Sequence, residues 1–99
     1  FLGLHPNGCG GNPNEGSACE SEGHDRNTIE LAGNQSLLLQ QVYAANKNTI
    51  LVLIHGGALN ISWAKSNVPG ILDAFYPGEL GGVALKNIIY GMAAPAGKL

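Results

Sequence analysis

Residues 49–54 (Thr-Ile-Leu-Val-Leu-Ile) form an unbroken run of β-branched and aliphatic side chains, which constrains the fold more than any other part of the chain. An apolar run of this length without polar alternation is typical of a strand buried on both faces of a parallel sheet. Parallel strands need a crossover segment between them, which is usually a helix. The run therefore predicts an α/β layered architecture.

The segment before this run has the pattern of a helix. Asn34 is a suitable cap residue, and we expect the helix to span 35–46. Within it Leu38, Val42 and Ala45 have the i, i+4, i+7 spacing of one helix face. This face is predicted to cover the sheet.

The segment after the run repeats the alternation. We expect a helical turn at 62–66, an extended apolar segment at 71–76 and a further helix closed by Gly91. The apolar stripe of that helix consists of Leu80, Ala84, Leu85, Ile88 and Ile89. With residues 1–4 as the end of another strand, these segments predict a layered α/β sandwich with a mostly parallel sheet, present as a partial domain.

Length and charge exclude several classes of function. The chain of 99 residues suffices for at most one domain. Five Lys and Arg stand against seven Asp and Glu without a basic cluster, so nucleic acid is not an expected partner. The longest purely aliphatic stretch, 50–54, is far below the roughly 18 residues of a membrane helix. We therefore expect neither a nucleic-acid partner nor a membrane partner.

Residues 8–23 are predicted to form a long surface loop, because glycine and asparagine are frequent and apolar periodicity is absent. Cys9 and Cys19 fit either a disulfide of a secreted protein or two reduced cysteines. Asn-x-Ser triplets at 34–36 and 60–62 match the N-glycosylation rule. Together these features favour a secreted, extracellular protein.

Motifs for nucleotides, metals and serine nucleophiles do not match. The sequence has no phosphate-binding loop, no G-x-G-x-x-G after an apolar strand and no G-x-S-x-G. A zinc site built from His5, Cys9, Cys19 and His24 would have a cysteine spacing that no common zinc motif uses. We expect no metal and no cofactor. His55, at the end of the buried run, is interpreted as a structural histidine, although α/β sites also form at that end of a strand.

The acidic residues are concentrated in one segment. Residues 20–26 (Glu-Ser-Glu-Gly-His-Asp-Arg) contain three carboxylates and the only arginine of the chain. By composition alone, such a segment is more often a salt-bridged surface loop than a catalytic one.

The order of several motifs changes this interpretation. Residues 20–26 and 29–35 resemble the E-x-E-x-x-D-R and L-P-G-x-Q motifs of the second domain of glycoside hydrolase family three. The resemblance continues through A-A-N-x-N-T-v-x-V-x-x-x-G-G, Y-P-G-E-x-G-G-x-A and G-x-x-x-P-x-G-K-L, which match residues 44–57, 76–84 and 91–99. Residues 59–65 are similar to the D-I-S-F-A-K stretch of β-xylosidases, which favours a xylose-type substrate over glucose.

The resemblance implies an exo-acting retaining β-glycosidase that hydrolyses oligosaccharides or β-xylosides, for example in xylan catabolism. The aspartate nucleophile would lie on an N-terminal barrel domain of the same parent chain, and this domain would supply the acid/base glutamate. In such chemistry the two carboxyl groups lie about 5 to 5.5 Å apart. The alternative is a non-catalytic sugar-binding or structural α/β module that lacks the barrel nucleophile.

For the acid/base residue we expect Glu20 first, Glu22 second and Glu15 third. Asp25 and Arg26 are expected to pair and to hold the loop in place. Ala32 departs from the proline that is common in the family, which removes a rigid kink but no proposed chemistry.

The nucleophile would have to come from outside these residues. Because the only methionine is Met92, we expect the sequence to be a piece of a longer chain. That piece alone is expected to be inactive.

Overall fold

The computed structural model describes residues 1–4, 20 and 26–97. The elements are β1 (Leu2–Gly3), α1 (Gln35–Ala45), β2 (Ile50–Ile54), α2 (Ser62–Asn67), β3 (Gly70–Asp73) and α3 (Gly81–Ile89). The three strands form one parallel sheet in the order β1-β2-β3, which confirms the predicted α/β class. The long loop predicted at 8–23, with its cysteine pair, lies outside the described residues except for Glu20.

The central strand β2 is the predicted apolar run. It pairs in parallel with both neighbours, so that Leu53 lies opposite Leu2 on one side and Asp73 on the other. Leu51, Val52 and Leu53 are each no more than 3% exposed, which agrees with a strand covered on both faces. The carboxyl ends of β2 and β3 therefore lie side by side, and the chain that follows them carries the candidate site.

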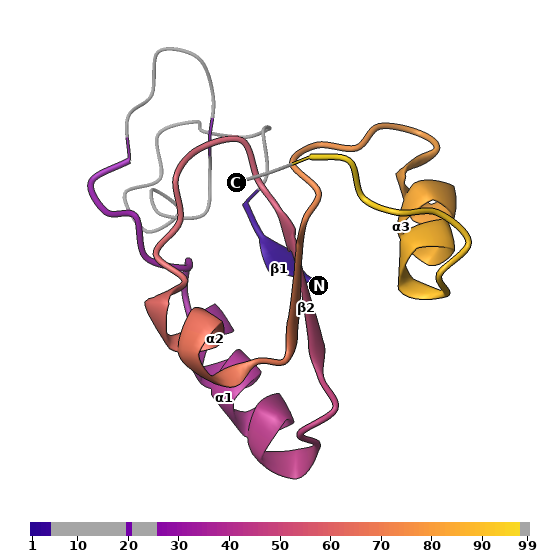
Figure 1. Ribbon diagram of the computed structural model, residues 1–99. Coiled ribbons are helices and arrows are strands. Elements are labelled where there is room, and N and C mark those ends of the chain that lie inside the picture. Colours follow the sequence, from indigo (N-terminus) through magenta and orange to yellow (C-terminus); the bar gives the residue numbers. More distant parts are fainter. Residues whose placement is uncertain (5–19, 21–25, 98–99) are drawn as a thin grey trace.

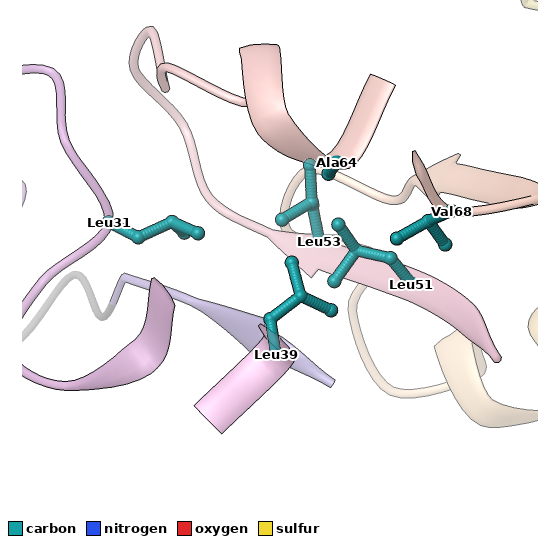
Figure 2. Packing of buried hydrophobic residues seen from close by; sticks show 6 residues of the cluster. All are labelled: Leu31, Leu39, Leu51, Leu53, Ala64 and Val68. Atoms are coloured by element: carbon teal, nitrogen blue, oxygen red, sulfur yellow. The ribbon is translucent and has the colours of Figure 1, made fainter. Parts of the chain in front are cut away.

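Helices α1 and α2 cover one face of the sheet, while α3 lies on the other side in Figure 1. The cluster of buried side chains between the sheet and the first two helices is shown in Figure 2 and consists of Leu31, Leu39, Leu51, Leu53, Ala64 and Val68. The sheet contributes Leu51 and Leu53 of β2 to this cluster, because alternate side chains of a strand point to the same face. This core fixes the strand on which the site is built.

The buried side of α1 is not the predicted one. Leu38 and Val42 are 51% and 44% exposed, whereas Leu39 is only 5% exposed. Leu39 and Tyr43 are also four residues apart, so the sequence offers two neighbouring stripes at helical spacing. The ring of Tyr43 packs edge-on against Trp63 of α2 at 5.7 Å between centroids. The buried stripe of α1 is therefore the one that contains Leu39 and Tyr43, and its Tyr43 ring contacts α2.

The second half of the chain agrees with prediction in outline and differs at the strand end. Helix α3 ends before Gly91, whose φ of 72° suits only glycine without strain. Of the predicted apolar stripe only Leu85 is buried, whereas Leu80 and Ile89 are 72% and 40% exposed, so the stripe as a whole does not face the core. The extended segment was predicted for 71–76, whereas β3 ends at Asp73. Phe75 has a φ of 50°, which turns the chain away from the sheet.

Candidate functional site

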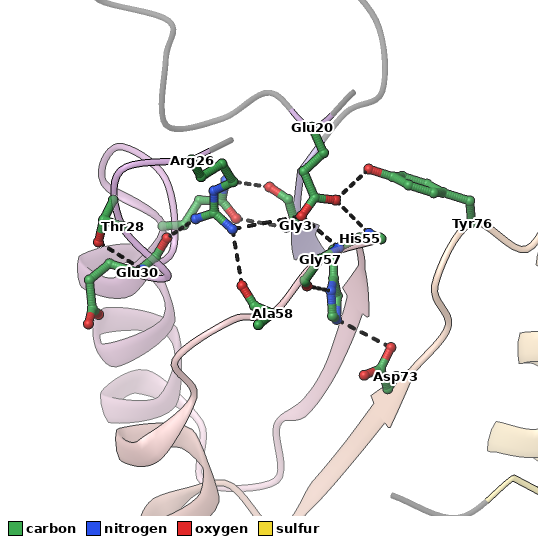
Figure 3. A network of polar contacts seen from close by, with 12 residues as sticks. Gly3, Glu20, Arg26, Thr28, Glu30, His55, Gly57, Ala58, Asp73 and Tyr76 are labelled. Atoms are coloured by element: carbon green, nitrogen blue, oxygen red, sulfur yellow. Dashed lines mark hydrogen bonds and ion pairs between the residues drawn. The ribbon is translucent and has the colours of Figure 1, made fainter. Parts of the chain in front are cut away.

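Glu20 lies at the carboxyl end of β2, where its carboxylate binds the Gly56–Gly57 turn. Oε2 accepts the Gly56 N–H at 2.5 Å and Oε1 accepts the Gly57 N–H at 2.7 Å. The Tyr76 hydroxyl, from the segment after β3, donates to Oε2 at 2.9 Å, as Figure 3 shows. The side chain of Glu20 is only 12% exposed. The Glu20 carboxylate therefore contacts the chain after β2 and the chain after β3. Open α/β sheets form their sites at these carboxyl ends of the strands.

The two glycines are required by this close approach. A Cβ atom on Gly57 would lie 2.5 Å from Oε1 of Glu20, and one on Gly56 would lie 2.9 Å from the Tyr76 ring. Both distances are shorter than any side chain tolerates, so a larger residue would displace the carboxylate or the ring. The glycine pair thus allows the carboxylate to reach the backbone amides.

Arg26 is the positive charge next to Glu20. Its Nη1 lies 3.8 Å from Oε1 of Glu20, and the side chain is 9% exposed. The guanidinium also donates to the carbonyl oxygens of Ala58 at 3.2 Å and Glu30 at 2.6 Å. Arg26 therefore ties the segment that contains it to the loop after β2. We call Gly56, Gly57, Tyr76 and Arg26 together the Glu20 cradle.

The cradle favours the ionised form of Glu20. Burial raises the pKa of the Glu20 carboxyl, but the hydrogen bonds from Gly56, Tyr76 and Gly57 and the charge of Arg26 outweigh it, so that the pKa is lowered. Burial and the neighbouring carboxylate raise the pKa of Tyr76 to about 12. At neutral pH the pair is thus a carboxylate and a protonated phenol. A general acid, by contrast, must hold a proton before the reaction begins.

The other predicted site residues have different outcomes. Glu15, Glu22 and Asp25 lie outside the described residues, so the expected pairing of Asp25 with Arg26 stays a prediction. Arg26 lies beside Glu20, the glutamate that it was expected to support. The sequence reasoning missed Tyr76 as a partner of Glu20. The signal that could have identified it is its place directly after the second of two parallel strands.

His55 and Asp73 form a second polar pair at the same strand ends. Nδ1 of His55 lies 2.6 Å from the carbonyl oxygen of Gly57, and Nε2 lies 3.3 Å from Oδ1 of Asp73. The two side chains are 7% and 14% exposed, so the expectation of a buried histidine is met. A cavity of about 370 Å³ opens beside the pair and is bordered by Phe75.

The described residues do not form a metal centre. Within 1–4, 20 and 26–97, no group of three or more His, Cys, Asp or Glu side chains lies close enough to hold a metal ion. In the same part of the chain, no helix is both long enough and apolar enough to cross a bilayer. The chemistry available at the strand ends is that of carboxylate, phenol, guanidinium and imidazole.

Comparison with known proteins agrees with the motif order. The family model for the glycosyl hydrolase family 3 C-terminal domain matches residues 8–99. An exo-α-(1→6)-L-arabinopyranosidase of Bifidobacterium breve is 46% identical over 83 residues, which cover 83% of this chain and 11% of that protein.

Two further relatives carry other substrate names. A β-xylosidase of Formosa agariphila is 40% identical over 79% of this chain and 11% of its own length. A β-glucosidase of Bacteroides ovatus is 36% identical over 81% of this chain and 11% of its own length. The chain thus spans about a ninth of the length of these relatives. No solved structure matches. Because the family model covers nearly the whole sequence, the chain belongs to the glycosyl hydrolase family 3 C-terminal domain family.

Proposed function

We propose that this chain is part of an exo-acting retaining β-glycosidase and that it supplies the acid/base glutamate. The observation that carries the proposal is the Glu20 cradle, which holds the Glu20 carboxylate at the carboxyl ends of β2 and β3. The nucleophilic aspartate would come from an N-terminal barrel domain of the same parent chain. The small share of each relative that the chain covers is consistent with such a longer parent.

The cradle also bears on which glutamate transfers the proton. Three hydrogen bonds and a nearby guanidinium stabilise the Glu20 carboxylate, and its pKa is lowered. In a retaining glycosidase the acid/base residue first donates a proton to the leaving oxygen, which requires a raised pKa. We therefore reverse the order expected from the sequence. Glu22 is proposed as the acid/base residue, and Glu20 as the anchor of the segment that carries it.

The proposed substrate is a terminal pentopyranoside. The stretch at 59–65 is similar to that of β-xylosidases, and the relatives include a β-xylosidase and an L-arabinopyranosidase. β-D-Xylopyranosides and α-L-arabinopyranosides are both five-carbon pyranosides with an equatorial glycosidic bond, and they differ in the orientation of the 4-hydroxyl group. The relative named a β-glucosidase makes the β-D-glucopyranoside the competing substrate.

We further propose that the parent protein is secreted. The support is the pair of Asn-x-Ser triplets at 34–36 and 60–62 and the two cysteines of the 8–23 segment. Secretion would fit an enzyme that acts on cell-wall oligosaccharides.

The test is turnover by the full-length parent chain. Nitrophenyl β-D-xylopyranoside, α-L-arabinopyranoside and β-D-glucopyranoside are compared by kcat/KM, and the anomeric form of the first product is read by NMR. We expect one of the two pentosides to be the best substrate, with retained configuration. Preference for the glucoside would overturn the substrate class. Absence of turnover on all three would favour the non-catalytic module.

A further inference from the structure

His55 has two polar neighbours that together fix its protonation. The Gly57 carbonyl oxygen, 2.6 Å from Nδ1, only accepts hydrogen bonds, so Nδ1 carries a hydrogen. In a neutral imidazole the other nitrogen, Nε2, would then have only a lone pair. Oδ1 of Asp73 lies 3.3 Å from Nε2. A lone pair would therefore face a carboxylate, which is also an acceptor.

The imidazolium form removes this conflict. Both of its nitrogens carry hydrogens, and its positive charge lies against the Asp73 carboxylate in a largely buried setting. Nε2 is buried and has no hydrogen-bond partner among the described residues. The negative charge of Asp73 is therefore the interaction that offsets the loss of water at this nitrogen. A neutral His55 would leave this nitrogen without any favourable partner among the described residues.

The same pair supports both sides of the Glu20 cradle. On the β2 side, Gly57 binds His55 through its carbonyl oxygen and Glu20 through its N–H. On the β3 side, Oδ1 of Asp73 accepts the Phe75 N–H at 3.2 Å. Phe75 precedes Tyr76, the residue that donates to Glu20. The pair thus holds the two chain segments that converge on one carboxylate.

We propose that His55 and Asp73 are positioning residues that hold the Glu20 cradle in shape. For catalysis the inference rests on the proposed function, because Glu20 is there the anchor of the acid/base segment. The charged group that faces His55 from β3 is Asp73, and Glu20 lies beyond the glycine turn with Arg26 beside it. The tilted Phe75 ring, 5.8 Å from the imidazole, covers the pair.

The first test reads the cradle without reference to activity. Hydrogen exchange of the peptide that contains Gly56 and Gly57 is followed by mass spectrometry in the full-length parent chain. His55→Leu removes both contacts, whereas His55→Asn keeps an amide N–H near the position of Nδ1. Asp73→Asn keeps the shape and the acceptor for Phe75 but removes the charge. Glu79→Gln, an exposed acid outside the cradle, is the control.

We expect His55→Leu to accelerate exchange of the two glycine amides by about tenfold, the scale of one lost charge-assisted hydrogen bond. Asp73→Asn should have a smaller effect, because asparagine keeps the acceptor for the Phe75 N–H. Exchange in His55→Leu equal to that of the Glu79→Gln control would overturn the inference. So would an Asp73→Asn effect larger than that of His55→Leu.

The second test separates positioning from general damage. Two aryl glycosides of the same sugar are compared, one with a leaving group that needs protonation and one with a dinitrophenolate that does not. His55→Leu should lower kcat about tenfold on the first substrate and only slightly on the second. Equal losses on both substrates would contradict a positioning role. If the wild-type parent hydrolyses neither, the proposed function fails, and the exchange experiment still decides the role of His55.

Discussion

The Tyr76 hydroxyl and the Glu20 carboxylate lie 2.9 Å apart although 56 positions separate the two residues in the sequence. Each comes from a segment next to a different strand end, and the hydrogen bond joins them over the Gly56–Gly57 turn. The lowered pKa of Glu20 and the raised pKa of Tyr76 are two consequences of this one contact and its neighbours. This relationship places the Glu20 carboxylate at the carboxyl ends of β2 and β3.

Removal of the phenol hydroxyl tests this contact. Tyr76→Phe should destabilise the parent protein by about 1–2 kcal/mol at neutral pH, because a charge-assisted hydrogen bond is lost. The pKa of Glu20 lies below its ordinary value of 4.5, so its contribution is present above that value and is lost as the pH falls through the lowered pKa.

The stability difference between wild type and Tyr76→Phe should therefore be constant from neutral pH down to about 5 and shrink below the ordinary pKa of glutamate. Melting temperatures measured across this range give the result. A difference that grows as the pH falls would show that the hydroxyl does not bind an ionised Glu20.

The glycine turn offers a matched pair of substitutions. Gly57→Ala places a methyl group 2.5 Å from Oε1 of Glu20, so the carboxylate must leave the cradle, at a cost of about 1–3 kcal/mol. Gly82→Ala, in the first turn of α3, meets nothing within 4 Å and replaces glycine by a better helix former. It should be neutral or stabilising. Equal melting temperatures for the two variants would contradict the close approach of Glu20.

The two stripes of α1 can be told apart by truncation. Leu39→Ala removes a side chain that is 5% exposed and should destabilise by about 2–5 kcal/mol. Leu38→Ala, at 51% exposure, should change the stability by about 0.5 kcal/mol or less in the parent chain. Denaturant midpoints measure both. The opposite order would mean that the stripe expected from the sequence is the buried one.

The two glycosylation triplets differ in structure. Asn34 is exposed and its side chain makes no capping hydrogen bond to α1. The amide of Asn60 donates to Glu30 at 2.7 Å, and its oxygen accepts from the Ser62 hydroxyl at 2.7 Å. On secretion from a eukaryotic host, we expect a glycan on Asn34 and none on Asn60. Glycopeptide masses test this, with Asn34→Gln as control, and occupancy of Asn60 alone would contradict it.

The sequence predicted the elements better than their contacts. The apolar run at 49–54 and the helical spacing at 35–46 depend on local periodicity, and the sheet and α1 agree with them. The choice of Leu39 over Leu38 depends on α2, which packs on α1 from another part of the chain. Strand β3 ends before the predicted residue 76 because Phe75 adopts a positive φ. Phenylalanine is not a typical turn residue, so the sequence does not indicate this turn.

The site was predicted in part for the same reason. The resemblance of residues 20–26 to a family motif made Glu20 a functional candidate, but the motif cannot show that this carboxylate binds Gly56, Gly57 and Tyr76. Those partners come from strand ends far along the chain. Burial raises the pKa of Glu20, and these contacts together with the charge of Arg26 outweigh burial and lower it.

The most direct test of the account compares Glu22→Gln with Glu20→Gln in the full-length parent enzyme, with sodium azide as an external nucleophile. An acid/base variant of a retaining glycosidase keeps its glycosyl-enzyme step on activated substrates, and azide attacks that intermediate without general-base help. We expect azide to restore turnover of Glu22→Gln and to give a glycosyl azide of retained configuration. Glu20→Gln should show a lower melting temperature and no azide response. Azide rescue of Glu20→Gln instead would contradict the assignment of Glu20 as the anchor.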